Sequence, residues 1–391
     1  MLLDLTHTSH TRALTGIQRV ARGLWAELGA AAEPVCFDPY AQAWRALTAT
    51  ERANLAAAPA GGKRRAVWPL RTRLAGIAGR IFSGSTRCLV RGGPDGLLAP
   101  EIFSPGAAAA LPALFAAVPG PRAAVFYDAV ALKRPELTPA GTVARYPAYL
   151  RELEAFDGIA AISADARDAL LEYWEWLGVR NHPPVAAITL GVGRPPVIPN
   201  LERRATVVLS VGTIEGRKNH AALLDACAAL WDRGALFDLR LIGAARPETG
   251  RAALERIAAL RARGRPVRHD GVVDDAALEA AYAGCAFTVY PSLMEGFGLP
   301  VAESLLRSRA CVCSGRGALG ESARGGGCLA LDSVDAASLA GAIGSLIGDR
   351  VLLARLEAEA RGRTFKTPAD YAREIRDWMG TLPRRGNVTE T

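Results

Sequence analysis

The 391-residue sequence lacks several short motifs that would assign it to a narrow class of proteins. It contains no Asp-x-Asp, which leaves no obvious carboxylate pair for a divalent ion, and no Cys-x-x-Cys. Its seven cysteines are spread too thinly for a disulfide framework, so a reducing cytoplasm fits best. The closest pair, Cys311 and Cys313, stands at strand spacing with both side chains on one face, and we expect it to be core packing.

Long apolar runs are also missing. The N-terminus has no basic leader followed by an apolar stretch, so no secretory signal is expected. The longest uncharged run, between Glu101 and Arg122, is interrupted by four prolines, which argues against a membrane span. The sequence therefore predicts a cytoplasmic protein.

Positive charge is concentrated in one segment. The chain has a net charge of +8, and residues 51–100 contain nine Lys and Arg residues against Glu51 and Asp95, a local balance of +7. Within that segment, residues 66–84 predict an amphipathic helix. Its apolar positions recur at helical spacing and form a stripe of Leu70, Leu74, Ile77 and Ile81. Three arginines lie largely off that stripe, namely Arg71, Arg73 and Arg80. An aromatic residue flanks each end, Trp68 before the helix and Phe82 after it.

Such a helix suits the surface of an anionic bilayer. The alternative is an ordinary helix of the first domain with its apolar face in the core and its arginines in water. Nucleic acid is not an expected partner, because no aromatic platform or recognised binding module accompanies the charge.

Short apolar runs alternate with helix-length amphipathic stretches, which is typical of an α/β protein with parallel sheets. The runs expected to form buried strands are 123–128, 158–163, 206–212, 238–243, 287–292 and 310–314. Residues 191–204 contain three prolines and are the best candidate for an interdomain linker. Because the pattern restarts afterwards, we expect two Rossmann-like domains, 1–195 and 205–366, which face a central cleft. Ligands of such sheets bind beyond the carboxyl ends of the strands.

Two carboxylates flank a glycine-rich loop in the segment 287–310, which reads as strand, loop and helix. Gly296 and Gly298 precede the helix N-terminus, where free N–H groups and the helix dipole attract a phosphate and glycine lets the backbone approach it. Glu295 could hydrogen-bond a sugar hydroxyl, and Glu303, about one turn into the helix, could reach a ribose. Alternatively, Glu303 only offsets the helix dipole and Glu295 is a solvated loop charge.

A second group of charges follows the strand run 206–212. Asn219 is the expected N-cap of the next helix, and Arg217 and Lys218 lie on the loop just before it. Two adjacent cations there suit a diphosphate, because they can neutralise leaving-group charge as it develops. A solvated Arg-Lys pair is the alternative.

Together, the stretches "EGFGLP" and "VGTIEGRKNH" resemble the retaining glycosyltransferases of family 4, which have the two-domain GT-B fold. The resemblance implies that Glu303 binds the nucleotide ribose and that Glu295 contacts the donor sugar. It also implies that donor oxygens are held by backbone amides of Phe297, Gly298 and Leu299 and that the phosphate is held by Lys218, with Arg217 beside it.

Other segments extend the resemblance. "TGIQRVAR" is similar to the family's first βα loop, with Gly16 beside the donor phosphate, and Val273 matches a contact to the base. "VFYDAVALKRPE" resembles the acceptor-side motif, with Tyr127 where histidine is commoner and Asp128 in its place. Thr213 stands where many members of the family have arginine, and we expect Arg217 to supply the charge of that missing arginine. The stretch "VGTIEGRKNH" is most similar to the mannosyltransferase branch of the family, which points to GDP-mannose as the donor. Residues 367–391 match a terminal helix that crosses back to the first domain.

The resemblance implies a hexosyltransferase that transfers with retention to a glycan or lipid-linked acceptor in the synthesis of a surface polysaccharide such as lipopolysaccharide. Because Asp-x-Asp is absent and two cations are at hand, we expect it to need neither a metal ion nor a cofactor. The enzyme would be cytoplasmic or peripheral on the inner face of the membrane. Two alternatives remain: a sugar-nucleotide-binding protein without transfer activity, suggested by Tyr127, and a nicotinamide-dependent oxidoreductase, suggested by "GRGALG" at 315–320. His7 and His10 have metal-ligand spacing but are expected to be solvated on a surface loop.

Overall fold

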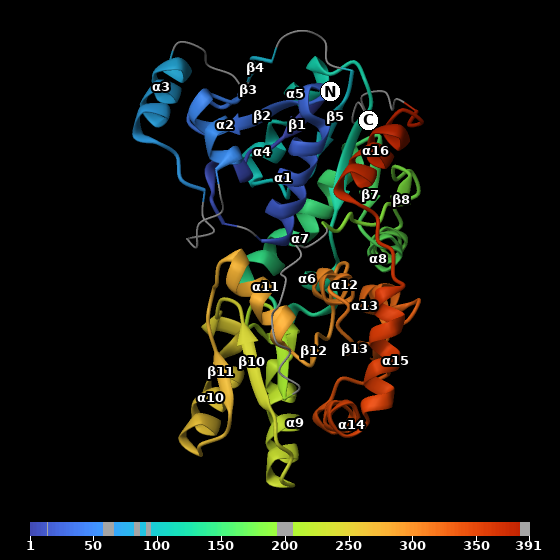
Figure 1. Ribbon diagram of the computed structural model, residues 1–391. Helices are drawn as coiled ribbons and strands as arrows, with labels where there is room; N and C mark the ends of the chain where they lie inside the picture. Colours follow the sequence, from blue (N-terminus) through green and yellow to red (C-terminus); the bar gives the residue numbers. More distant parts are fainter. Residues whose placement is uncertain (14, 58–65, 82–86, 91–94, 194–205, 384–391) are drawn as a thin grey trace.

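The computed structural model describes residues 1–391 except 14, 58–65, 82–86, 91–94, 194–205 and 384–391 (Figure 1). It contains two α/β units, drawn one above the other in Figure 1, each built around its own sheet. The expected fold class, an α/β protein with two Rossmann-like domains, is therefore confirmed. The expected strand runs all form strands whose bounds agree to within about two residues.

The N-terminal sheet has the order β4-β3-β2-β1-β5-β6-β7-β8 among the described residues. Neighbouring strands are parallel except β2 and β3, which pair antiparallel. The strands are β1 (Leu2–Asp4), β2 (Glu33–Asp38), β3 (Ala43–Ala46), β4 (Arg87–Cys88), β5 (Leu97–Ala99), β6 (Arg122–Phe126), β7 (Gly158–Ala161) and β8 (Val185–Ala187).

Helices cover both faces of this sheet. They are α1 (Gly16–Leu28), α2 (Ala49–Ala56), α3 (Leu70–Ile81), α4 (Pro105–Ala109), α5 (Leu111–Ala117), α6 (Val130–Lys133), α7 (Ala140–Glu152) and α8 (Ala164–Trp176). Successive residues of a strand point to opposite faces, so Val125 and Phe126 of β6 enter two different apolar cores. Burial on both faces explains why the strand runs read as continuous apolar stretches.

The C-terminal sheet is parallel throughout its described strands, in the order β11-β10-β9-β12-β13-β14. Its strands are β9 (Val207–Val211), β10 (Asp238–Ile242), β11 (Val267–His269), β12 (Phe287–Tyr290), β13 (Cys311–Ser314) and β14 (Cys328–Leu331). Its helices are α9 (His220–Asp232), α10 (Pro247–Ala262), α11 (Asp275–Gly284), α12 (Leu299–Leu306), α13 (Gly317–Ala323), α14 (Ala336–Gly348) and α15 (Arg350–Arg361).

The last described helix, α16 (Pro368–Met379), packs against the first domain. Its residues Tyr371, Ile375 and Met379 belong to the same apolar core as Leu3 and Leu24. The two segments that connect the domains lie side by side, because the Val192 N–H donates to the Lys366 carbonyl at 2.8 Å. Most of the expected linker 191–204 lies outside the described residues.

Across the described part of the chain, no single helix is both long and apolar enough to cross a bilayer. The bent pair α14 and α15 meets those criteria only when the two helices are taken together.

Candidate active site

The loop between β12 and α12 carries the glycine-rich motif to the carboxyl edge of the second sheet. Gly298 is the N-cap of α12 and has φ +95°, a left-handed conformation that favours glycine. Pro300 occupies the first turn of the helix, as expected. The helix N-terminus is therefore placed at the mouth of the cleft, where its free N–H groups can meet an anion.

Glu295 is buried between two cations at this edge. Its carboxylate lies 2.6 Å from an Arg217 guanidinium nitrogen and also accepts a hydrogen bond from the Lys218 ammonium. Burial by itself raises the pKa of Glu295, but Arg217 and Lys218 outweigh it and lower that pKa to about 2. The three side chains form an ion triad in which Glu295 is 10%, Lys218 13% and Arg217 26% exposed, so the alternative of a solvated loop charge is wrong.

The two cations are held by the loop after β9. Residues Gly216–Lys218 form a short 3-10 turn, and Asn219 follows in a left-handed conformation. Asn219 is the N-cap of α9 by position, but its side-chain amide donates to the Val334 carbonyl at 2.8 Å rather than capping the helix. The Leu293 N–H donates to the Arg217 carbonyl at 2.9 Å, so the two charged loops are bonded directly to each other.

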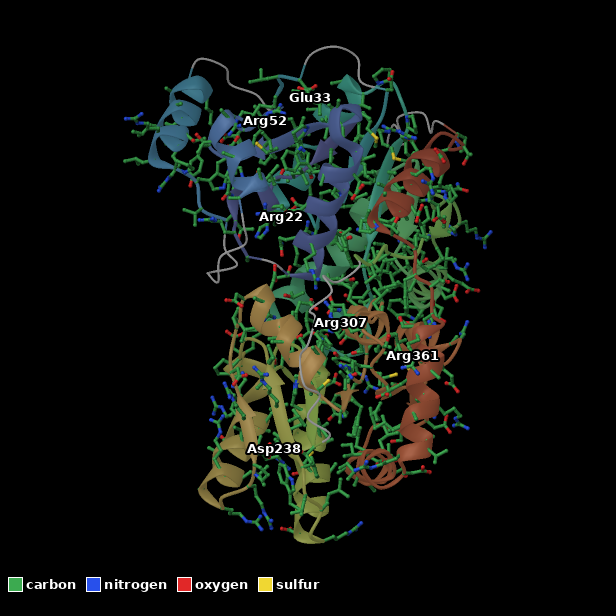
Figure 2. The ribbon with its side chains drawn as sticks, in the orientation of Figure 1. Arg22, Glu33, Arg52, Asp238, Arg307 and Arg361 are labelled. Carbon is green, nitrogen blue, oxygen red and sulfur yellow. The ribbon has the colours of Figure 1, made fainter. Side chains whose placement is uncertain are left out.

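Glu303 lies on α12 and pairs with a residue of the other domain. One carboxylate oxygen is 2.8 Å from the guanidinium of Arg19 on α1, and the other is 3.4 Å from the Tyr282 hydroxyl. Glu303 and Arg19 line a cavity of about 640 Å³ between the domains, together with residues of α11, α12 and α16. Arg307, labelled in Figure 2 where the two domains meet, lines the same cavity and donates to the Glu279 carboxylate at 2.8 Å.

Gly296 brings the loop between β12 and α12 against the first domain. A methyl group at this position would collide with the carbonyl oxygen of Tyr127 and lie 3.1 Å from the Asp128 side chain. Asp128 follows β6 at the carboxyl edge of the first sheet, and its pKa is raised by burial, with Arg217 acting in the opposite direction. The Tyr127 side chain is buried, and its hydroxyl donates to the Pro100 carbonyl at 2.6 Å within the first domain.

The two domains also meet through a pair of helix N-termini. The Glu321 carboxylate accepts from the N–H groups of Ala164 (3.1 Å) and Asp165 (2.6 Å) at the start of α8. Asp165 in turn accepts a hydrogen bond from the backbone N–H of Ala318 at the start of α13. Each domain therefore supplies the carboxylate that caps a helix of the other.

The "GRGALG" motif forms the turn into α13. Gly317 has φ +56°, and a methyl group on it would lie 3.1 Å from an Asp165 carboxylate oxygen. Gly317 thus serves the contact between α13 and α8, whereas a methyl group on Gly320 would collide with the Gly315 carbonyl inside the motif. These are packing roles that the dinucleotide interpretation did not include.

Three further candidate donor residues are not among those that line the interdomain cavity. Gly16 is the first residue of α1, and open space surrounds the position of a side chain there. Thr213 follows β9, next to the turn at Gly243. Val273 is partly buried against the cluster that contains Leu209.

The histidines near the N-terminus differ from expectation. His10 is buried, stacks on Trp68 with 3.5 Å between ring centroids and lies 2.8 Å from the Glu51 carboxylate, so a solvated loop position is wrong for it. The same loop is fixed by Glu101, which accepts from the N–H groups of His7 and Thr8. Hydrogen bonds to the first domain therefore hold the loop that precedes α1 in place.

Cys311 and Cys313 lie in an apolar core, and with Cys328 of β14 they bring three sulfur atoms within 4.8 Å of one another. Core packing, the expected role of the first two, agrees with this position.

Sequence reasoning missed Arg19, Ser163 and Glu321, all of which join the domains. The Ser163 hydroxyl donates to the Gly296 carbonyl at 2.7 Å and so joins the first domain to the loop between β12 and α12. Arg19 lies three residues after Gly16, in the first turn of α1. Its position just after the expected first βα loop is the one sequence feature that could have predicted a role in the cleft. No local pattern indicates which group of the other domain each residue meets.

Two Rossmann-like domains, with charged βα loops at the carboxyl edges of both sheets facing each other across a cleft, define the GT-B fold. Residues 205–349, which form most of the second domain, match the family described as Glycosyl transferases group 1. None of the curated proteins is similar to the sequence at a significant level.

Solved structures share this fold, two of those that follow over nearly the whole chain. HepE from Anabaena, in complex with UDP and glucose, is 16% identical, with a TM-score of 0.67 over 97% of this chain and 99% of that one. Sucrose-phosphate synthase from Thermosynechococcus elongatus is 16% identical, with a TM-score of 0.66 over 96% and 97%. TarM from S. aureus, in complex with UDP among other ligands, is 12% identical, with a TM-score of 0.57 over 73% and 55%.

Proposed function

We propose that the protein is a retaining glycosyltransferase that moves a hexose from a nucleotide diphosphate sugar to a glycan or lipid-linked acceptor. The observation that carries this proposal is the pairing of Glu295, on the loop just before α12, with Arg217 and Lys218. Glu303 lies on α12 itself. The match of residues 205–349 to Glycosyl transferases group 1 supports it independently.

The cations and the helix N-terminus supply the groups that a diphosphate requires. A leaving diphosphate gains negative charge as the bond to the sugar breaks, and preorganised cations stabilise that charge in the transition state. Arg217 and Lys218 are already held in place by Glu295, so little reorganisation is needed when the donor binds. These groups take the role of a metal ion in the proposed mechanism, which requires neither a metal nor a cofactor.

In the proposed front-face reaction, the bond from the anomeric carbon to the diphosphate oxygen breaks while a bond to the acceptor oxygen forms on the same face. The acceptor proton passes to the departing phosphate oxygen, so no side-chain nucleophile is needed. Glu295 holds the donor sugar, and Asp128, whose pKa lies above its usual range because of burial, faces the acceptor side together with Tyr127.

For the donor, the wording of residues 211–220 favours GDP-mannose, whereas the structures of HepE and TarM contain UDP. Thermal shift with GDP, UDP and ADP distinguishes these bases, because a ligand stabilises only the fold that binds it. Stabilisation by GDP alone supports the mannosyl assignment, and stabilisation by UDP alone overturns it.

The proposed activity is tested by incubating the protein with GDP- and UDP-sugars and following release of the nucleotide. NMR of the transferred sugar gives the anomeric configuration, which must match that of the donor. Nucleotide binding without any turnover would instead support a sugar-nucleotide-binding protein. A change in nicotinamide absorbance would support the oxidoreductase.

A further inference from the structure

Helix α3 is attached to the first domain with its apolar side facing outward. Leu70, Leu74 and Ile77 are 65%, 58% and 46% exposed, and Val67 just before the helix is also exposed. Figure 1 shows α3 at the outer edge of the N-terminal domain, apart from the body of the sheet. An ordinary surface helix buries this stripe in the core, so that alternative from the sequence is wrong.

Another side of the helix touches the domain, and there Gly76 is buried. A methyl group on Gly76 would lie 2.8 Å from the Tyr40 Cβ and 2.9 Å from the Ala41 nitrogen. The Arg73 guanidinium lies over the Tyr40 ring, 5.2 Å from its centroid. Because only glycine fits at this contact, rotating the helix to bury its leucines would break the packing.

The charge around the stripe has a single sign. From residue 52 to residue 94 the sequence contains no aspartate or glutamate. At about 3.6 residues per turn, Arg71 lies on one side of the apolar stripe and Arg73 and Arg80 lie on the other. Long arginine side chains in this arrangement can reach toward anionic groups while the stripe between them is buried.

We propose that α3 is a docking surface for an anionic lipid bilayer. A lipid surface accepts an apolar stripe and flanking cations at the same time, which matches both features of α3. A protein partner would need shaped complementarity and paired acidic groups, for which the exposed stripe gives no indication. The inference deepens the proposed function, because a lipid-linked acceptor would be presented at the same surface.

The test is sedimentation of the full chain with vesicles of phosphatidylcholine alone or mixed with phosphatidylglycerol. We expect binding to the mixed vesicles only, with release by salt as the charges are screened. The variant R71Q/R73Q/R80Q should lower the partition coefficient roughly 100-fold, since each basic residue near the surface contributes about 1 kcal/mol. The variant L70S/L74S/I77S should also lose binding, because the apolar stripe no longer inserts.

Control variants carry substitutions of the same kind on the second domain. L236S/V272S/V351S removes three apolar side chains that are more exposed than those of the α3 stripe, and R233Q/R251Q/R263Q removes three exposed arginines. Both controls should sediment like the parent. Nucleotide-induced stabilisation is measured for every variant. The α3 variants should retain it, which separates failure of this inference from failure of the proposed function.

Binding to neither vesicle, equal binding to both, or α3 variants that sediment like the controls would overturn the proposal. A parent chain that is dimeric in analytical ultracentrifugation and becomes monomeric in L70S/L74S/I77S would assign the stripe to a second copy instead. Salt-sensitive binding of RNA with no binding of vesicles would assign the charge to nucleic acid.

Discussion

Glu303 of the second domain and Arg19 of the first form an ion pair at 2.8 Å across the domain boundary. The Arg19 side chain is 48% exposed, whereas that of Glu303 is 10% exposed. The carboxylate proposed to bind the ribose is therefore already occupied by an arginine. A nucleotide whose ribose binds Glu303 therefore has to displace Arg19 from the carboxylate and replace it with the ribose hydroxyl groups.

Replacing Arg19 with methionine should tighten nucleotide binding. A half-exposed ion pair contributes about 0.2–1 kcal/mol, so removal of the competing arginine should lower the nucleotide Kd by up to roughly five-fold. Isothermal titration calorimetry of the parent and of R19M gives both constants. The matched control is R22M, one turn further along α1, which removes an arginine that bonds to backbone carbonyls of its own domain.

Replacing Glu303 with alanine should have the opposite effect and weaken nucleotide binding, because the ribose contact is lost in the ground and transition states alike. The two substitutions thus shift the nucleotide Kd in opposite directions. A Kd that is unchanged in E303A would exclude the ribose role. A weaker affinity in R19M would mean that Arg19 assists binding rather than competing for the carboxylate.

Replacing Glu295 with glutamine should lower kcat by roughly 100-fold or more, while nucleotide affinity changes little. The neutral amide keeps the shape of the side chain but cannot hold Arg217 and Lys218 with the same strength. Steady-state kinetics under donor saturation measure the effect, and E248Q on the exposed surface of α10 is the control. Near-normal turnover in E295Q would remove Glu295 from the reacting centre.

The difference in stability between the parent and the same variant should depend on pH. Because the pKa of Glu295 is lowered from 4.5 to about 2 in the folded state, its stabilising contribution is complete above pH 4.5 and is lost as the pH falls toward 2. The difference in unfolding free energy between the parent and E295Q should narrow by roughly 2 kcal/mol between pH 5 and pH 3. Urea denaturation at each pH provides the values. A constant difference across this range would show that Glu295 is not paired in solution.

Transfer should persist in EDTA, because Arg217, Lys218 and the α12 N-terminus are proposed to stabilise the diphosphate. Lys218→Ala should then cost about 2 kcal/mol of transition-state stabilisation, or roughly a 30-fold loss in kcat. The exposed Lys133, which pairs with Glu172 at 2.9 Å, gives the control K133A. Activity that disappears with the chelator and returns with Mn²⁺ or Mg²⁺ would overturn the metal-free mechanism.

The parts of the fold that the sequence indicated are those whose signal is local. Buried parallel strands such as β9 and β12 are continuous apolar runs, and these were recognised. The three-residue strands β1 and β5 gave no comparable signal, although they lie at the centre of the first sheet. The antiparallel β3 was also missed, because its pairing with β2 depends on a short reversal of the chain.

The residues of the candidate site also differ in whether a local sequence pattern predicts them. Arg217 with Lys218, and Glu295 with Glu303, are close in sequence and could be recognised from their spacing before a helix. Their partners are not local: the Glu303–Arg19 pair and the capping of α8 by Glu321 join segments that are far apart along the chain. The glycine at 296 was explained by approach to a phosphate, whereas the structure places the Tyr127 carbonyl against it.

The contact between Gly296 and the Tyr127 carbonyl limits how closely the two domains can approach each other at the cleft. With no side chain at position 296, the loop that carries Glu295 rests directly on the backbone beside Asp128. A methyl group at position 296 would collide with the Tyr127 carbonyl and force the two domains slightly apart, although it would not contact a substrate. A misplacement of about 1 Å between reacting groups can reduce a rate by roughly 100-fold. The spacing between the proposed donor and acceptor sides therefore depends on the absence of one carbon atom at position 296.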